Sequence, residues 1–263
     1  MTSLNDTGPG FYDQRKIRPG LILDWQIHRY PDVGSTNDVA AQLAERGADE
    51  GCVVVAEAQS AGRGRHGRAW ASPPGAGLYV SAVLRPTPAV APLLTLAAGV
   101  SIAEGIHAAT GLQPCVKWPN DVFAGGRKLA GILAEATASP AGRPYVVLGF
   151  GINVMPAAFP PHLAVLATSL EGELGRAVDR ELLLTSCLGR LATRYLDLQQ
   201  GAGPVVLDAW RERAAPMLRR PVEWDRDQVP TRGVAEDIDD TGALLVRTDS
   251  GVMRVISGEV RWL

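Results

Sequence analysis

The chain has 263 residues and carries 26 basic and 28 acidic side chains, which gives a formal net charge of −2. This near balance argues against a dedicated nucleic-acid-binding protein, whose affinity depends on a basic surface. Hydrophobic residues make up 46% of the chain, which excludes a largely disordered protein. The length permits one large domain, or one large and one small domain.

The cysteines and the N-terminal segment indicate a cytoplasmic protein. Cys52, Cys115 and Cys187 are far apart in apolar surroundings, which is typical of reduced core thiols. The four histidines are equally scattered, so we expect no metal site built from protein ligands. No apolar run approaches the roughly 20 residues that span a bilayer, and the N-terminus does not resemble a secretory signal. We therefore expect no membrane partner.

Local patterns predict helices and strands through most of the chain. Residues 1–20 are polar and contain several Gly and Pro, so we expect a loose N-terminal segment over 1–30. Ser35-Thr36-Asn37-Asp38 predicts a helix start, because short oxygen side chains accept the N–H groups of a first turn. This helix should end at Gly47. The further predicted elements are strands at 52–56, 78–84, 115–117, 129–135 and 145–148, and helices at 93–110 and from 179 to about 199.

The sequence changes character after residue 215. Short apolar stretches around Val222, Val234, Leu245 and Val255 alternate with polar turns such as Asp239-Asp240-Thr241-Gly242. This spacing predicts a small all-β module of about 45–50 residues. We therefore predict an α/β domain over 31–215, followed by a small β-barrel over 216–263.

The most unusual segment is the arginine loop, defined here as Gln59 to Trp70. It places three glycines and three arginines within seven residues, directly after a predicted buried strand. Glycine lets a backbone turn tightly and approach a ligand closely. Arginine offers planar, permanently charged donors that suit phosphates and carboxylates. The segment therefore predicts an anion-binding loop; the alternative is a solvated basic surface loop.

Two better-known nucleotide motifs do not fit this loop. Gly62, Gly64 and Gly67 satisfy G-x-G-x-x-G, but that fingerprint requires a helix to begin there. The chain instead continues into Trp70-Ala71-Ser72-Pro73-Pro74-Gly75, which is not a helical sequence. A phosphate-binding P-loop also fails, because no Gly-Lys-Ser/Thr follows.

Three further segments combine chemistry-bearing residues with apolar strands. Lys117-Trp118-Pro119-Asn120-Asp121 joins a cation, an aromatic ring, an amide and a carboxylate, although a plain turn would also explain it. Lys128 heads the apolar stretch to Glu135, where an exposed strand-end charge is the alternative. Gly149-Phe150-Gly151-Ile152-Asn153 indicates close approach of a ligand, or else a β-bulge.

These four segments, in this order and with Ser35-Thr36-Asn37 upstream, resemble the biotin–protein ligase family. The family pattern runs G-R-G-R-x-G-R-x-W, K-W-P-N-D, K-L-A-G-I-L-x-E and G-x-G-x-N, and each element is present from Ser35 to Asn153. The resemblance implies an α+β fold, with a mixed-sheet catalytic domain of the biotin/lipoate ligase type and a small C-terminal SH3-like β-barrel. It also implies an enzyme that activates biotin with ATP and Mg²⁺, then transfers it to a lysine of a biotin carboxyl carrier protein.

The resemblance also implies which residues form the site. The catalytic residues are Arg65 and Lys128, which hold the anions, and Asp121, which lies near the entering carrier lysine. The biotin-binding residues are Ser35, Thr36, Asn37, Gln59, Gly62, Arg63, Gly64, Arg65, Lys128 and Gly131. The residues implied for ATP and the adenylate are Arg63, Arg65, Arg68, Trp70, Lys117, Asn120, Lys128 and Asn153.

Elementary chemistry agrees with these roles. Joining a carboxylate to a phosphate brings two anions together, and cations stabilise the charge on the transferring phosphoryl oxygens. The mixed anhydride must also be kept from water, so the arginine loop is expected to close over it.

The same residues allow two alternative functions, a lipoate ligase and a nucleic-acid-binding module. A lipoate ligase of the same fold differs in the acid that it binds, and a nucleic-acid-binding module would use Arg63, Arg65 and Arg68. Some family members carry an N-terminal helix-turn-helix domain, but only about 30 residues precede the catalytic region here. We expect a monofunctional ligase, either a monomer or a weak homodimer, without DNA binding.

Overall fold

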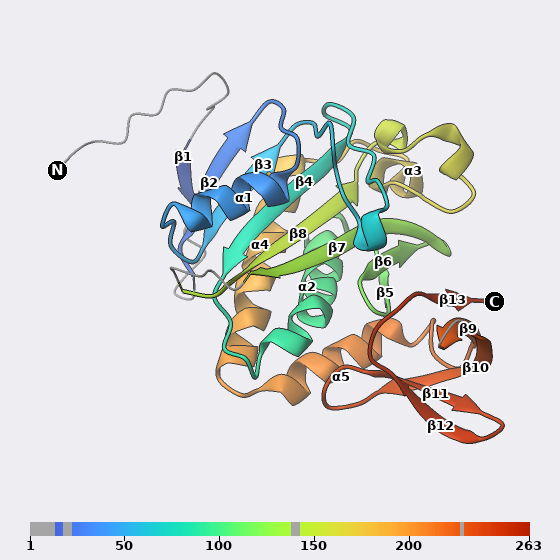
Figure 1. Ribbon diagram of the computed structural model, residues 1–263. Coiled ribbons are helices and arrows are strands. Elements are labelled where there is room, and N and C mark those ends of the chain that lie inside the picture. The colour runs from blue at the N-terminus through green and yellow to red at the C-terminus, as the bar shows by residue number, and fades with distance from the viewer. Residues whose placement is uncertain (1–13, 18–22, 138–142, 227–228) are drawn as a thin grey trace. The chain divides into compact units, whose positions relative to one another are not determined.

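The computed structural model describes residues 14–17, 23–137, 143–226 and 229–263 (Figure 1). The chain divides into two compact units, each built from two stretches of sequence. The first unit comprises Met1–Arg85 and Ile132–Arg180, and the second comprises Pro86–Gly131 and Glu181–Leu263.

The first unit is built on a mixed β-sheet with the strand order β1-β2-β3-β4-β8-β7. Strands β2 and β3 are parallel, whereas β1–β2, β3–β4 and β4–β8 are antiparallel. Every residue of β3 and β4 is buried, which explains their continuous apolar sequences. The bounds are β1 (Gln14–Ile17), β2 (Trp25–Tyr30), β3 (Cys52–Ala56), β4 (Gly77–Leu84), β7 (Arg127–Thr137) and β8 (Tyr145–Asn153).

Helix α1 (Thr36–Glu45) lies across strands β3, β4 and β8 (Figure 1). It buries Ala40 and Ala44 against Val54 of β3 and Val147 of β8. Its first turn therefore lies over the middle of the sheet, with the polar start of the helix facing strand side chains. The unit is completed by α3 (Leu170–Leu174) and the short 3₁₀ turns η1 (Arg65–Gly67), η3 (Pro156–Ala158) and η4 (Pro161–Leu163).

The second unit contains three long helices and a hairpin. In it β5 pairs with β6, and β6 pairs with the first part of β7. Helix α2 packs on α5, β5 and β6. It also crosses α4 closely, because a Cβ atom on Gly105 would lie 2.6 Å from Cα of Cys187. The bounds are η2 (Ala91–Leu93), α2 (Leu94–Thr110), β5 (Cys115–Lys117), β6 (Asp121–Ala124), α4 (Arg180–Gln199) and α5 (Gly203–Ala214).

No apolar run long enough to span a bilayer was expected from the sequence, but one helical segment of this unit meets that criterion. Ala91–Thr110 is long and apolar enough to cross a membrane, by length and composition alone. Most of it is buried within the folded chain, where Leu96, Val100, Ile102 and Ile106 are core residues. Core packing therefore accounts for its apolar composition.

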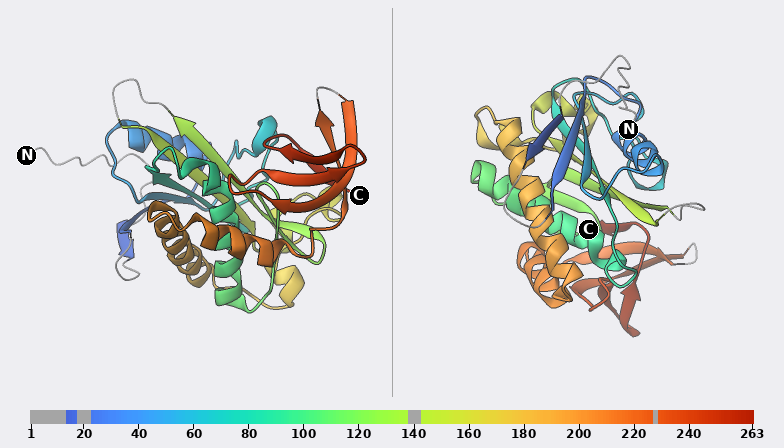
Figure 2. Two further views of the ribbon diagram at one scale, coloured as in Figure 1. Left: turned by 90° about the horizontal axis from the view of Figure 1, so that it is seen from below. Right: turned by 90° about the vertical axis from the view of Figure 1, so that its left-hand side faces the viewer.

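The second unit ends in a separate five-stranded antiparallel sheet with the order β12-β11-β10-β9-β13. Figure 2 shows this sheet, in red, as strongly twisted. The bounds are β9 (Pro221–Arg226), β10 (Val229–Ile238), β11 (Leu244–Thr248), β12 (Gly251–Val255) and β13 (Val260–Trp262). The predicted α+β class, with a mixed sheet and a small all-β module, is confirmed.

The structure also corrects some sequence-based expectations. The loose segment expected over 1–30 is wrong at residues 14–17 and 25–30, which form the paired strands β1 and β2, with Trp25 and Ile27 of β2 fully buried. Residues 1–13 and 18–22 of that segment lie outside the described residues. Helix α5 and strands β6 and β13 were not predicted, because they are short or weakly patterned. The boundary at 215–216 stays a prediction.

Candidate active site

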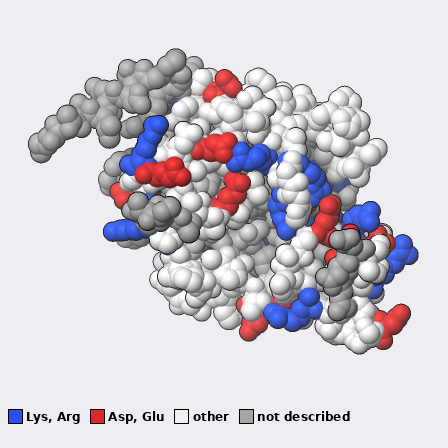
Figure 3. Space-filling model, in the orientation of Figure 1, with Lys and Arg blue, Asp and Glu red and all other residues white. Residues whose placement is uncertain are grey.

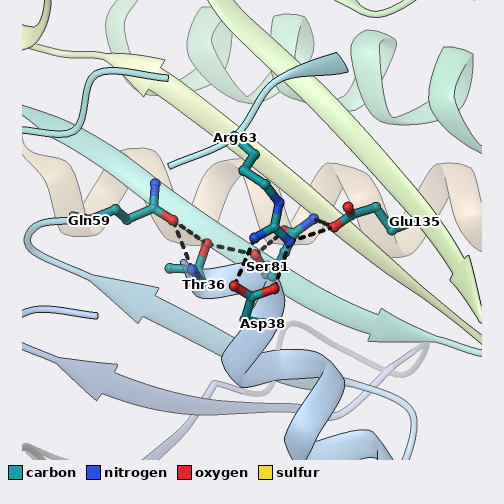
Figure 4. Close-up of polar contacts among 7 residues, drawn as sticks. Thr36, Asp38, Gln59, Arg63, Ser81 and Glu135 are labelled. Atoms are coloured by element: carbon teal, nitrogen blue, oxygen red, sulfur yellow. Dashed lines mark hydrogen bonds and ion pairs between the residues drawn. The ribbon is translucent and has the colours of Figure 1, made fainter. Parts of the chain in front are cut away.

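A buried polar network surrounds the first turn of α1 in the first unit (Figure 4). The backbone N–H and the hydroxyl of Thr36 both donate to Oε1 of Gln59, at 2.8 and 3.0 Å. Ser35 was expected to cap this helix, but within the described chain its side chain makes no capping hydrogen bond. Gln59, from the arginine loop, caps the helix instead, which ties the loop to the predicted biotin-binding residues.

The network continues through Ser81 of β4 and Glu135 of β7. Oγ of Ser81 lies 2.8 Å from Oγ1 of Thr36 and 2.6 Å from Oδ1 of Asn37, and its single proton serves one of them at a time. Nδ2 of Asn37 donates to Oε2 of Glu135 at 2.5 Å. Sequence reasoning missed both partners, although a serine inside a fully apolar strand was a usable signal.

The glycines of β8 make room for two of the site side chains. A Cβ atom on Gly149 would collide with Oδ1 of Asn37, and one on Gly151 would lie 2.5 Å from Nε1 of Trp70. The sequence had suggested that a ligand approaches these glycines or that the strand bulges. The described structure instead places an amide and an indole ring against the strand.

The arginine loop folds back on itself as a tight hairpin. Arg63 and Ala69 form an antiparallel bridge, and the N–H of Trp70 donates to the carbonyl of Gly62 at 2.8 Å. A Cβ atom on Gly62 would lie 2.5 Å from the carbonyl oxygen of Trp70, so the hairpin requires glycine there. At the tip, His66 and Gly67 have positive φ angles of 56° and 71°. Arg65 and Arg68 flank this tip.

Arg63 is held by two carboxylates at the base of the loop. Its guanidinium donates to both oxygens of Asp38, at 2.7 and 2.6 Å, and its Nη2 lies 3.4 Å from Oε2 of Glu135. The hydrogen bond to Asp38 raises the pKa of Arg63, and in return lowers the pKa of Asp38. The resemblance predicts that Arg63 contacts biotin and the adenylate. In the structure its guanidinium forms ion pairs with two protein carboxylates, Asp38 and Glu135.

In the second unit, Lys128 and Asp121 form a close ion pair. Nζ of Lys128 lies 2.6 Å from Oδ1 of Asp121, and both side chains are partly exposed. The two residues lie on the neighbouring strands β7 and β6, where Asp121 is the register partner of Gly131. The structure thus brings together two of the three predicted catalytic residues and one predicted lining position.

Lys117, a predicted nucleotide contact, lies between two aromatic rings. Its Nζ is 5.0 Å from the ring of Phe123 and 4.8 Å from the ring of Trp262. Burial lowers the pKa of Lys117, and the charge of Asp121 opposes that shift. Nearby, Nε1 of Trp118 donates to the carbonyl of Gly242 at 2.9 Å. The five-stranded sheet therefore supports the K-W-P-N-D segment directly.

Asn153 has a structural partner. Its Nδ2 donates to the carbonyl of Thr168 at 3.0 Å, and both residues are buried. This bond holds the end of the segment between β8 and α3, together with a bond from the N–H of Glu171 to the carbonyl of Val154. The nucleotide contact of Asn153 stays a prediction.

The comparisons with known proteins agree with this arrangement. Residues 31–153 match the model of the biotin/lipoate A/B protein ligase family, and residues 220–260 match the biotin protein ligase C-terminal domain. The chain is 36% identical, over 262 residues, to the biotin–[acetyl-CoA-carboxylase] ligase of Mycobacterium tuberculosis, covering 94% of each chain. This chain belongs to the biotin protein ligase family.

One further sequence relative and one solved structure are similar to this chain over most of its length. The bifunctional ligase/repressor BirA of Bacillus subtilis is 36% identical over 264 residues, which cover 96% of this chain and 79% of that protein. The solved structure of the Aquifex aeolicus biotin protein ligase in complex with biotin and ATP superimposes with a TM-score of 0.75 at 26% identity. That match covers 90% of this chain and 99% of the Aquifex chain.

Proposed function

We propose that this ligase activates biotin with ATP to form biotinyl-5′-AMP, and then transfers the biotinyl group to one lysine of a biotin carboxyl carrier protein. The observation that carries the proposal is the network beside the arginine loop in which the half-buried Gln59 joins the buried Thr36, Asn37 and Ser81. A ureido ring needs several donors and acceptors when buried, because an unpaired polar group is costly. Hydroxyl and amide side chains supply both.

In the first step an oxygen of the biotin carboxylate attacks the α-phosphorus of ATP. A new P–O bond forms, and pyrophosphate leaves with the electrons of the bond that breaks. Arg65 and Lys128 are the proposed cations that stabilise the negative charge of the phosphoryl oxygens. The other arginine at the loop tip, Arg68, is the proposed contact for the rest of the polyphosphate.

Mg²⁺ would neutralise part of the polyphosphate charge. Within the described ranges no group of three or more His, Cys, Asp or Glu side chains is arranged to hold a metal ion. Mg²⁺ needs only one or two carboxylates when phosphates supply the other oxygens, so an ion that arrives with ATP does not require a preformed cluster of protein ligands.

In the second step the carrier lysine attacks the carbonyl carbon of the mixed anhydride. The C–O bond to the phosphate breaks, AMP leaves, and the amine loses a proton. A lysine amine has an ordinary pKa of about 10.4, so it must be deprotonated before it attacks. We assign to Asp121 the orientation of this amine, because its carboxylate is partly exposed and already paired with the cation of Lys128.

Biotin-dependent exchange of labelled pyrophosphate into ATP tests the first step. We expect exchange with biotin and not with lipoate, and a loss on the order of 10²- to 10³-fold for Lys128→Ala and for Arg65→Ala. Asp49→Asn, an exposed carboxylate away from the described contacts, is the matched control and should behave as the wild type. Exchange with lipoate alone would assign the chain to lipoate ligation instead.

The remaining expectations concern partners and location. We propose a carrier domain of an acyl-CoA carboxylase as the protein substrate, a cytoplasmic location, and a monomer or weak homodimer without DNA or membrane binding. On the face drawn in Figure 3, basic and acidic side chains are interspersed, which argues against a nucleic-acid-binding surface on that face. Filter binding at low salt tests DNA binding, and light scattering with and without biotin tests the oligomeric state.

A further inference from the structure

We propose that Arg63 is a positioning residue that anchors the arginine loop to α1 and β7 through Asp38 and Glu135, and that it does not bind the substrates itself. The inference rests on the proposed function and deepens it, because it concerns the loop that is expected to close over the adenylate. It assigns roles to two carboxylates, Asp38 and Glu135, that were not among the predicted site residues.

The geometry of the Arg63–Asp38 pair is that of an anchor. Both guanidinium Nη atoms donate to separate oxygens of one carboxylate, at 2.7 and 2.6 Å (Figure 4). This parallel, two-bond arrangement fixes both the distance and the orientation of the planar guanidinium. A second carboxylate, Glu135, lies 3.4 Å from Nη2. The side chain thus has partners on two different elements of the first unit.

The local charge argues against a substrate anion at Arg63. One positive charge faces the negative charges of Asp38 and Glu135, which leaves this cluster with a net charge of about −1. The biotin carboxylate and the phosphates of ATP are themselves anions, so they would be repelled unless Arg63 first left its partners.

The position of Arg63 in the hairpin explains what the anchor achieves. Arg63 and Ala69 form the bridge at the base of the hairpin, and residues 64–68 lie beyond it. Fixing the base therefore sets where the tip arginines can reach. Glu135 also accepts the hydrogen bond of Asn37, so the anchor shares an acceptor with a predicted biotin-binding residue. Loop position and the biotin-side network are thereby linked.

Variants that remove the anchor are expected to remain folded. The side chains of Arg63, Asp38 and Glu135 are 36%, 51% and 41% exposed, so the ion pairs are partly screened by solvent. Loss of such a pair is expected mainly to loosen the loop locally, with only a small decrease in the global stability. Variants at Arg63, Asp38 and Glu135 can therefore test the anchor in a folded protein.

The test is a double-mutant cycle with Asp38→Asn, Arg63→Ala and the double variant, and with Asp49→Asn as the matched control. The first measurement is limited trypsin cleavage after Arg65 and Arg68 in the native protein without substrates. The second is the loss of biotinyl-5′-AMP from the enzyme, with kcat and KM for biotin and ATP in pyrophosphate exchange. Asp38→Asn keeps the size of the side chain and removes only the charge.

We expect Asp38→Asn and Arg63→Ala to give the same result. Each should speed loop cleavage and adenylate loss by roughly 3- to 10-fold, and the double variant should be no worse than either single variant. Glu135→Gln, which keeps an acceptor for Asn37, should have a smaller effect of about 2-fold. The control should match the wild type.

The proposal is overturned if Asp38→Asn behaves as the wild type while Arg63→Ala is impaired, or if the two effects multiply in the double variant. Either result would mean that Arg63 acts by touching the substrates. A wild-type protein without biotin-dependent exchange would instead refute the proposed function. The cleavage measurement needs no substrate and would still test the anchor in that case.

Discussion

The ammonium group of Lys117 lies 4.8 Å from the ring of Trp262, the residue before the C-terminal Leu263. Phe123 provides a second ring at 5.0 Å, so the cation lies between two aromatic faces. Nε1 of Trp262 donates to the carbonyl of Met217 at 2.7 Å, which fixes the indole ring. The last strand of the small sheet therefore shapes the surroundings of a predicted nucleotide contact.

Removing this ring should weaken the use of ATP. We expect Trp262→Leu to raise the KM for ATP by about 2- to 30-fold, the range that corresponds to a cation–π contact in exposed and desolvated settings. The KM for biotin should stay within about 2-fold. Trp262→Phe keeps an aromatic face and should recover most of the loss. Equal effects of Leu and Phe in pyrophosphate exchange would exclude a contribution of the ring to Lys117.

Adding a methyl group at Gly149 should damage biotin binding selectively. In Gly149→Ala the new Cβ atom would occupy the space of the Asn37 amide, which must then leave Ser81 and Glu135. Overpacking of this kind costs about 1–3 kcal/mol, so we expect biotin affinity to fall about tenfold or more by titration calorimetry. Gly189→Ala, in α4 with open space around it, is the control and should slightly stabilise the protein. Unchanged biotin affinity in Gly149→Ala would contradict the assignment of Asn37.

The two steps of the reaction should respond differently to the loss of Asp121. We expect Asp121→Asn to lower transfer to the carrier on the order of 10- to 100-fold, with pyrophosphate exchange reduced about 3-fold or less. The reason is that the carboxylate is assigned to the incoming amine, whereas Lys128 keeps its charge for the adenylate. Single-turnover transfer from preformed adenylate measures the second step alone. An equal loss in both measurements would place Asp121 in the first step.

Stability should depend on pH through the Arg63–Asp38 pair. The hydrogen bond from Arg63 lowers the pKa of Asp38 in the folded state. The pair therefore stabilises the protein fully above the unfolded pKa of about 3.9, and this contribution is lost as pH falls through the lower folded value. We expect the difference in urea midpoint between the wild type and Asp38→Asn to grow from about pH 2 to about pH 5 and then stay level. A difference that does not change with pH would show that the charge of Asp38 is not involved.

Much of the architecture followed from local sequence patterns. The fully apolar stretches at Cys52–Ala56 and in Gly77–Leu84 predicted buried strands, and the glycine after Thr110 predicted the helix end, where Gly111 has a φ angle of 81°. The all-β character of the tail followed from its short apolar stretches and polar turns such as Asp239-Asp240-Thr241-Gly242. These features depend on neighbours within a few residues, which is why one sequence suffices for them.

The contacts within the candidate site could not be predicted in the same way. Asn37 and Glu135, which are hydrogen-bonded, are 98 positions apart in the chain, and the paired residues Arg63 and Asp38 are 25 positions apart. Likewise, nothing in the local sequence says that Gln59 caps α1 in place of Ser35, or that Lys117 meets the ring of Trp262.

The sequence by itself determined the family, the order of the chemical groups and most of the secondary structure, because motif spacing and hydrophobic periodicity are local properties of the chain. Only the tertiary structure decided which carboxylates hold Arg63 and why Gly149 and Gly151 must be glycine. The physical reason is that hydrogen bonds and steric limits act through space. Their partners are known only once α1, β7 and β8 have packed together.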